Sequence, residues 1–137
     1  MDQRILVPLD GSDCGETILP KVEELASRLE KGICLLRVTS AHTFPGADPT
    51  EAEIKVVREA EQYLKDVEDR LKAKGFDVDT HVRYGDEVEE ILDHASQKEI
   101  DFIAMSRRHQ GIKDLLLGSV AEKILRHAPK PVFLARC

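Results

Sequence analysis

The sequence of 137 residues has few aromatic residues and few cysteines. It contains no Trp, only 4% aromatic residues and three Cys, at positions 14, 34 and 137, with no Cys-x-x-Cys pair. An odd number of widely spaced Cys excludes a disulfide framework and a zinc ribbon, and it favours a reducing compartment. We therefore expect Cys34 to fill the core and Cys137 to be an inert thiol, with oxidation across a dimer in air as the alternative.

Long hydrophobic runs are absent as well. The longest apolar stretch covers residues 115–121, far short of the roughly 20 residues needed to span a bilayer. The sequence from Met1 leads directly into Ile5-Leu6-Val7 without the pattern of a secretory signal. The expected location is the cytoplasm.

The charge balance is acidic, with a formal net charge of -6 at pH 7. A general nucleic-acid binder would show a basic face and a much higher isoelectric point, so this class is excluded. With 42% hydrophobic and 34% charged residues, the chain has the composition of one globular domain covering 1–137. Its core must consist mainly of Ile, Leu, Val and Ala.

Short apolar runs alternate with amphipathic stretches along the whole chain. Repeated strand–helix–strand units without hairpin signals predict an α/β fold, a doubly wound, five-stranded parallel sheet with four helices in three layers. The third strand alternates polar and apolar residues, as expected at a sheet edge. The expected strands are 5–9, 33–38, 76–84, 101–105 and 132–135.

Local signals predict how the helices begin and end. The first helix follows Ser12 or Asp13, contains Pro20 in a kink or irregular first turn, and ends at Gly32. The long second helix ends at Gly75. Three polar residues followed by Glu three positions later predict capping boxes, namely Thr50 with Glu53, Asp86 with Glu89 and Ser119 with Glu122.

The sheet predicts where a ligand would bind. Ligands of such sheets lie beyond the carboxyl ends of the strands, where the strand order reverses. The first and fourth strands are apolar on both faces and form the natural central pair. The expected cleft therefore lies between Asp10-Gly11-Ser12 and the loop that begins Ser106-Arg107-Arg108, near Gly118-Ser119.

Each of these residues also has a purely structural interpretation. A helix that starts at Gly118-Ser119 can bind phosphate with its free N–H groups, but Ser119 can equally cap that helix. Asp10 can accept hydrogen bonds from a ribose or base, or merely cap a turn. Arg107 and Arg108 form a basic patch, although surface arginines are common.

Three motifs in order resemble the universal stress protein family: Ile5–Ser12 (ILVPLDGS), Gly85-Asp86, and residues 115–129 before a final Pro-Val strand. The resemblance covers the whole chain. It implies a flavodoxin-like or Rossmann-like domain without established catalytic chemistry, with slow ATP hydrolysis as the most that is expected. It also implies a homodimer that pairs through the last strand, at Val132, Phe133, Leu134 and Ala135.

One branch of this family binds ATP and another does not. In the binding branch Pro8 and Asp10 would line the adenosine pocket and Val38 would offer backbone groups to adenine. The phosphates would lie on a Gly-x-x-Gly-x9-Gly-Ser/Thr motif, whose first two glycine positions fall here on Met105 and Arg108.

These two replacements affect the phosphate loop in opposite ways. Met105 would crowd the pocket, and a side chain in a left-handed conformation costs on the order of 1–2 kcal/mol. Arg107 and Arg108 could replace lost backbone contacts with charge-assisted hydrogen bonds. The candidate nucleotide-binding residues are Pro8, Leu9, Asp10, Ser12, Val38, Met105, Ser106, Arg107, Arg108, Gly118, Ser119 and Val120.

Two hypotheses of function remain open at this point. The first is a cytoplasmic stress-response regulator that binds ATP or another adenine nucleotide weakly or in an altered pose. The second is a family member without nucleotide binding that acts as a protein-interaction homodimer. The sequence has no Walker A motif, dinucleotide fingerprint or nucleophile elbow, and its five His show no metal-ligand spacing.

Overall fold

Five parallel strands form a single sheet in the computed structural model, which describes residues 3–40, 46, 48–107 and 118–137. The strand order is β3-β2-β1-β4-β5, so β2 and β3 lie on one side of β1, and β4 and β5 lie on the other side. This is the predicted doubly wound fold, and its strand order reverses between β1 and β4. The strands are β1 Arg4–Pro8, β2 Gly32–Thr39, β3 Val78–Tyr84, β4 Ile100–Arg107 and β5 Val132–Arg136.

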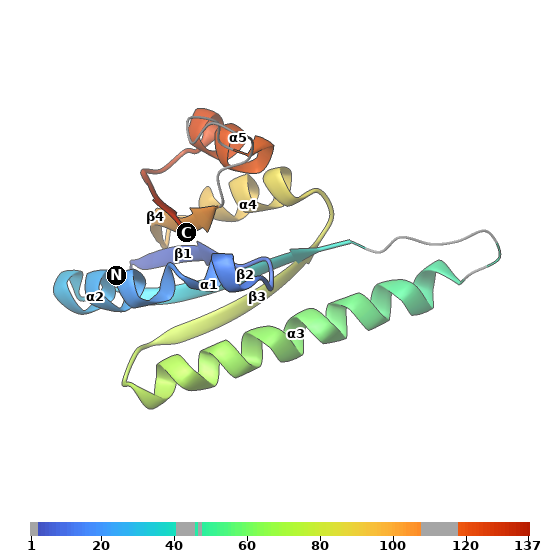
Figure 1. Ribbon diagram of the computed structural model, residues 1–137, viewed down its shortest axis with the longest axis horizontal. Helices are drawn as coiled ribbons and strands as arrows, with labels where there is room; N and C mark the ends of the chain where they lie inside the picture. Colours follow the sequence, from blue (N-terminus) through green and yellow to red (C-terminus); the bar gives the residue numbers. More distant parts are fainter. Residues whose placement is uncertain (1–2, 41–45, 47, 108–117) are drawn as a thin grey trace.

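Helices cover both faces of the sheet (Figure 1). One face carries α1 Asp13–Glu16, α2 Leu19–Leu29 and α3 Pro49–Ala73, and the other carries α4 Glu87–Ala95 and α5 Ser119–His127. Among the described helices, none is long and apolar enough to cross a membrane.

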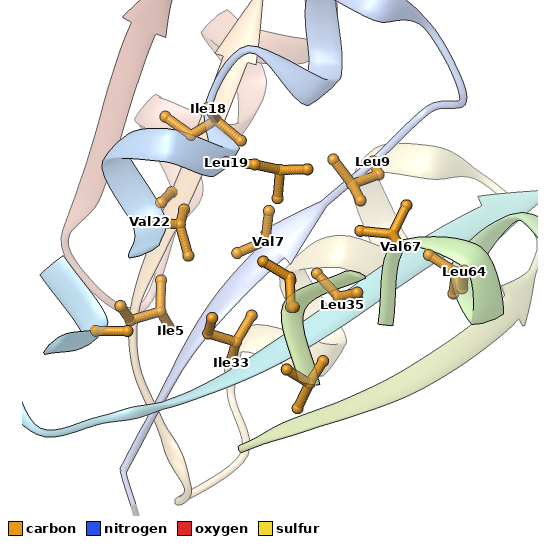
Figure 2. Close-up of a cluster of buried hydrophobic side chains, with 14 residues drawn as sticks. Ile5, Val7, Leu9, Ile18, Leu19, Val22, Ile33, Leu35, Leu64 and Val67 are labelled. Atoms are coloured by element: carbon orange, nitrogen blue, oxygen red, sulfur yellow. The ribbon is translucent and has the colours of Figure 1, made fainter. Parts of the chain in front are cut away.

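The central strand β1 divides its side chains between two cores because successive residues of a strand point to opposite faces. Ile5 and Val7 belong to the core that also contains the apolar residues of α2 and α3, and Figure 2 shows both of them near Val22. Leu6 belongs to the second core, under α4 and α5. Aliphatic residues dominate both cores, as the low aromatic content predicts.

The first predicted helix is divided in two. Ser12 caps the single turn of α1, its Oγ accepting a hydrogen bond from the Gly15 amide at 3.0 Å. The second part, α2, begins at Leu19 with Pro20 in its first turn, where a missing N–H group breaks no helical hydrogen bond. The predicted interruption is present as the break between α1 and α2, but the turn that contains Pro20 is regular, with Val22 N donating to Ile18 O at 3.0 Å.

Two predicted helix boundaries are wrong. The first helix ends before Gly32, because Glu30 adopts a left-handed conformation (φ 54°) after Leu29. At the start of α3 the N-cap is Asp48, whose side chain accepts a hydrogen bond from Thr50 N at 2.9 Å. Pro49 fixes this boundary, since its ring favours the first helical position. The predicted cap of Asp86 is confirmed by its hydrogen bond from Glu89 N at 3.0 Å.

Cys14 and Cys137 form a disulfide, with their Cα atoms 5.5 Å apart. The expectation that Cys137 is an inert thiol is therefore wrong. The fold brings the residue after β5 against α1, across a sequence separation of 123 residues. Cys34 is a buried free thiol, as predicted.

Candidate functional site

A cavity of about 290 Å³ lies at the carboxyl ends of β1 and β4, where the strand order reverses. This volume is near the lower limit of about 300 Å³ for typical ligand pockets. The described residues that line it are Asp10, Ser12, Cys14, Ser106, Arg107, Gly118, Ser119, Val120 and Ala121. The predicted cleft is therefore a real cavity, and Cys14 and Ala121 are the lining residues that the sequence analysis missed.

A larger hollow of about 670 Å³ lies between α3 and β3. Exposed ends of long side chains, among them Arg58, Glu61 and Lys65, form much of its lining. Flexible exposed side chains do not hold a ligand in one orientation, whereas the smaller cavity has partly buried polar groups held by hydrogen bonds. We therefore take the smaller cavity as the candidate site.

Asp10 is held in place by the start of α1. Its Oδ1 accepts hydrogen bonds from Ser12 N at 3.0 Å and from Ser12 Oγ at 2.5 Å. A Cβ atom at Gly15 would lie 2.7 Å from the same oxygen, so only glycine allows this close approach. Burial opposes ionisation of Asp10, but the hydrogen bonds from Ser12 and the charge of Arg107 outweigh it and lower the pKa of the carboxyl group.

Arg107 connects the end of β4 to two other elements. Its Nη1 donates to Asp10 Oδ2 at 3.3 Å, and its Nη2 donates to Glu87 Oε2, at the start of α4, at 3.0 Å. Its Nε is buried and has no hydrogen-bond partner among the described residues. The strand was expected to end before Ser106, but β4 continues to Arg107 and fixes this side chain in the cavity wall.

The start of α5 has no side-chain cap in the described part of the chain. The predicted capping box of Ser119 and Glu122 is wrong: the N-cap is Gly118, which has no side chain to accept a hydrogen bond. Ser119 is the first helical residue, and Glu122 forms an ion pair with Arg126 at 2.7 Å instead. The first N–H groups of α5 thus lie at the cavity without a side-chain acceptor, and they carry the positive end of the helix dipole.

Several predicted site residues do not line the cavity. Pro8, Leu9 and Val38 are buried, and both Leu9 and Val38 have side chains in the two cores. Met105 is 1% exposed and packs in the core under α4 and α5. Arg108 lies outside the described residues.

The expectation that Met105 crowds the pocket is therefore wrong. Neighbouring residues of β4 point to opposite faces, so Met105 enters the core while the residue after it lines the cavity. Met105 also has no left-handed backbone conformation, because Glu30 is the one non-glycine residue with positive φ in the described chain. The backbone strain that a side chain would have at a glycine position with positive φ is therefore absent at Met105.

Two further residues, which lie next to the elements that line the cavity, were not predicted. Arg37 of β2 lies over the turn after β1, where its Nη2 would be 3.7 Å from a Cβ atom at Gly11. It makes no ion pair with the described residues, so its charge is available to a ligand. Thr17 supports the wall, its Oγ1 lying 3.0 Å from Ser106 Oγ. No short motif marks either residue, because both act through contacts between different elements.

Comparisons of the sequence and of the structure with known proteins identify the same protein family. Residues 1–136 match the model of the universal stress protein family. A universal stress protein of Methanothermobacter thermautotrophicus is 31% identical over 143 residues, which cover 99% of this chain and 97% of that protein. Universal stress protein YxiE of Bacillus subtilis is 29% identical over 148 residues, 99% of this chain and 100% of that protein.

Solved structures with this fold extend the comparison. The structure of hypothetical protein MJ0577, from Methanocaldococcus jannaschii, has a TM-score of 0.83 and 27% identity, covering 100% of this chain and 97% of that one. Universal stress proteins solved in complex with cAMP (TM-score 0.71, 21% identity) and, from Archaeoglobus fulgidus, with dAMP (0.70, 20%) share the fold, each covering 98% of this chain and 97% of the other. Each of these matches covers at least 97% of this chain and at least 97% of the other protein. This chain belongs to the universal stress protein family.

Proposed function

We propose that this protein is a cytoplasmic stress-response regulator that binds an adenine nucleotide such as ATP or AMP in the cavity between β1 and β4. The observation that carries the proposal is the uncapped first turn of α5 beside Asp10 and Arg107. Free N–H groups at a helix start are suited to phosphate oxygens, and a carboxylate accepts hydrogen bonds from a ribose or an adenine amino group.

The helix start cannot provide the affinity alone. A helix dipole contributes about 0.3–1 kcal/mol, whereas micromolar affinity corresponds to about 8 kcal/mol. The remaining contribution requires cationic side chains; Arg107 lines the cavity, and Arg37 lies over the neighbouring turn at Gly11. Hydrogen bonds from a guanidinium group to a phosphate contribute roughly 1.5–3 kcal/mol each.

The ion pairs of Arg107 are the reason why we propose weak binding or an altered pose. Asp10 and Glu87 together carry two negative charges against the one positive charge of Arg107. A phosphate that approaches this group must either compete with the carboxylates for Arg107 or lie closer to Arg37. The two nucleotide complexes of the same fold support the nucleotide class of ligand.

A charge substitution at the helix start tests the proposal. Ser119→Glu puts a carboxylate where a phosphate would lie, and a carboxylate at the first turn does not weaken the helix itself. We expect ATP, ADP and AMP to bind the unaltered protein in equilibrium dialysis, and at least tenfold more weakly to Ser119→Glu. The matched control is Ser27→Glu, the same change on an exposed position of α2, away from the cavity lining.

Binding that is reduced equally by both substitutions would contradict the site, because it would reflect total charge alone. The complete absence of binding at millimolar nucleotide would favour the second candidate function, a protein-interaction homodimer without nucleotide. The observation behind this candidate is the edge strand β5, which exposes Phe133 and in the described chain pairs only with β4. Such an edge can accept a strand from a second copy.

A further inference from the structure

A group of metal-ligating side chains lies on the opposite face of the sheet from α2 and α3. Cys34 comes from β2, His81 from β3 and His94 from α4, and one ligand atom of each lies within 4.8 Å of the other two. Cys34 and His94 are 1% and 2% exposed, whereas His81 is exposed on the edge strand. These residues show no metal-ligand spacing in the sequence because they come from three separate elements.

The pairing of the strands explains why the group forms. In the parallel register of β2 and β3, Cys34 is opposite Asp79, and Leu36 is opposite His81. Residues two positions apart share a face, so Cys34, Asp79 and His81 all point toward the same side of the sheet. The helix α4 packs over this side and supplies His94 from its last turn.

The distances suit a tetrahedral ion. Ligand atoms with bonds of about 2.0–2.3 Å to zinc lie about 3.5 Å from each other. Cys34 Sγ and His94 Nε2 are already 3.4 Å apart. The exposed side chain of His81 is the one that would move to complete the site, and its exposure leaves a fourth position open to water.

We propose that Cys34, His81 and His94 bind a divalent transition-metal ion of the zinc type. One thiolate and two imidazoles are ligands that zinc and cobalt prefer, whereas calcium and magnesium require oxygen ligands. This site is separate from the nucleotide cavity and does not depend on the proposed function.

Asp79 completes the surroundings of the ion as a positioning residue. Its Oδ2 lies 3.2 Å from His81 Nε2, and a hydrogen bond there leaves Nδ1 of His81 as a lone-pair donor. Its buried Oδ1 has no hydrogen-bond partner among the described residues, and the Arg4 Nη1 atom is 3.8 Å away. A metal-bound thiolate and this carboxylate would together balance the two positive charges of the ion.

Arg83 competes with the metal for His94. Its Nε donates to His94 Nδ1 at 2.9 Å, so the proton of the neutral imidazole lies on Nε2, facing Cys34. Metal binding at Nε2 requires this proton to move to Nδ1 and Arg83 to turn toward Glu90 and Asp93, which it already contacts. The thiol of Cys34 loses its proton to solvent, so each bound ion releases one proton.

The disulfide gives the experiment a specific spectroscopic signal. With Cys14 and Cys137 joined, Cys34 is the one free thiol of the chain, so a thiolate-to-cobalt absorption band can come only from Cys34. We expect titration of the oxidised full chain with Co²⁺ to give this band at one ion per chain, and Zn²⁺ to abolish it by displacement. No such band, or a band that persists in Cys34→Ser, would overturn the proposal.

A histidine pair provides the matched control. His81→Gln changes an exposed residue, and we expect it to weaken Co²⁺ binding at least tenfold while circular dichroism stays unchanged. His127→Gln changes an exposed histidine of α5 outside the group and should leave the affinity unchanged. Equal affinities of the two variants would exclude His81 as a ligand and overturn the site.

Discussion

At the residue scale, the candidate site combines predictable and unpredictable parts. Asp10 follows β1 and Arg107 is the last residue of the neighbouring strand β4, and the sequence alone predicts that they lie at the same cleft. That Arg107 is already shared between Asp10 and Glu87 could not be predicted, because Glu87 reaches it from a helix on one face of the sheet. The charge of a basic residue at a cleft therefore indicates a ligand only when its partners are known.

The hydrogen bonds of Ser12 give a prediction about pH. Asp10 has a lowered pKa in the folded protein, so its ionisation stabilises the fold above its ordinary pKa of 3.8 and this contribution disappears as the pH falls through the lower folded value. Ser12→Ala removes the Oγ donor to Asp10 and the cap of α1. We expect a higher pKa of Asp10 by NMR titration of its carboxyl carbon.

The same substitution should lower the free energy of unfolding by about 1 kcal/mol at pH 7, the typical effect of losing an N-cap. Part of this loss should vanish in urea unfolding at a pH below the lowered pKa of Asp10 in the folded protein, where Asp10 is protonated in either variant. Ser27→Ala, on an exposed part of α2, should change neither quantity. An unchanged pKa in Ser12→Ala would show that Ser12 does not set the ionisation of Asp10.

At the element scale, the type and order of the helices and strands were predictable, but their first residues were less so. The same pattern of a polar residue and a later Glu gave a correct cap at Asp86 and wrong caps at Thr50 and Ser119. Pro49 moves one helix start back to Asp48, and at α5 the extended backbone of Gly118 takes the N-cap position. Because the N-cap of α5 is Gly118 and not Ser119, no side chain of the described residues accepts a hydrogen bond from the first N–H groups of α5, and these groups are available to an anion.

The edge strand β5 carries the prediction of a homodimer. Phe133 is 38% exposed on this strand, and antiparallel pairing of two copies would cover it and satisfy the free strand edge. We expect sedimentation equilibrium at tens of micromolar to give a dimer, and Phe133→Asp to give a monomer.

Leu125→Asp is the matched control for this substitution. Leu125 is 43% exposed on α5, so the change removes a comparable apolar side chain and adds the same charge. A dimer that survives Phe133→Asp but not Leu125→Asp would assign the interface to α5 rather than to β5.

At the scale of the whole molecule, strand order follows from alternation and burial, whereas contacts between distant chain segments do not. The sequence places the switch point between the first and fourth strands because both are apolar on both faces. Neither the Cys14–Cys137 disulfide nor the group of Cys34, His81 and His94 has a local signature. Each depends on where several elements come together in three dimensions.

The disulfide predicts that a reducing agent lowers stability. It closes a loop across 123 residues, and chain entropy gives a limit of about 5 kcal/mol for such a length, with 2–4 kcal/mol typical of measured disulfides. We expect the free energy of unfolding in urea to fall by an amount in this range when dithiothreitol is added.

The cysteine variants separate this constraint on the chain from other effects of reduction. Without reductant, Cys137→Ser should have the same free energy of unfolding as the unaltered protein has in dithiothreitol. Because Cys14 then has no disulfide partner, adding dithiothreitol to this variant should cause no further change. Cys34→Ser should keep the full response, because the thiol of Cys34 lies outside the disulfide. If mass spectrometry shows the disulfide intact and reduction still leaves the unfolding curve unchanged, the link between α1 and the chain end does not stabilise the fold.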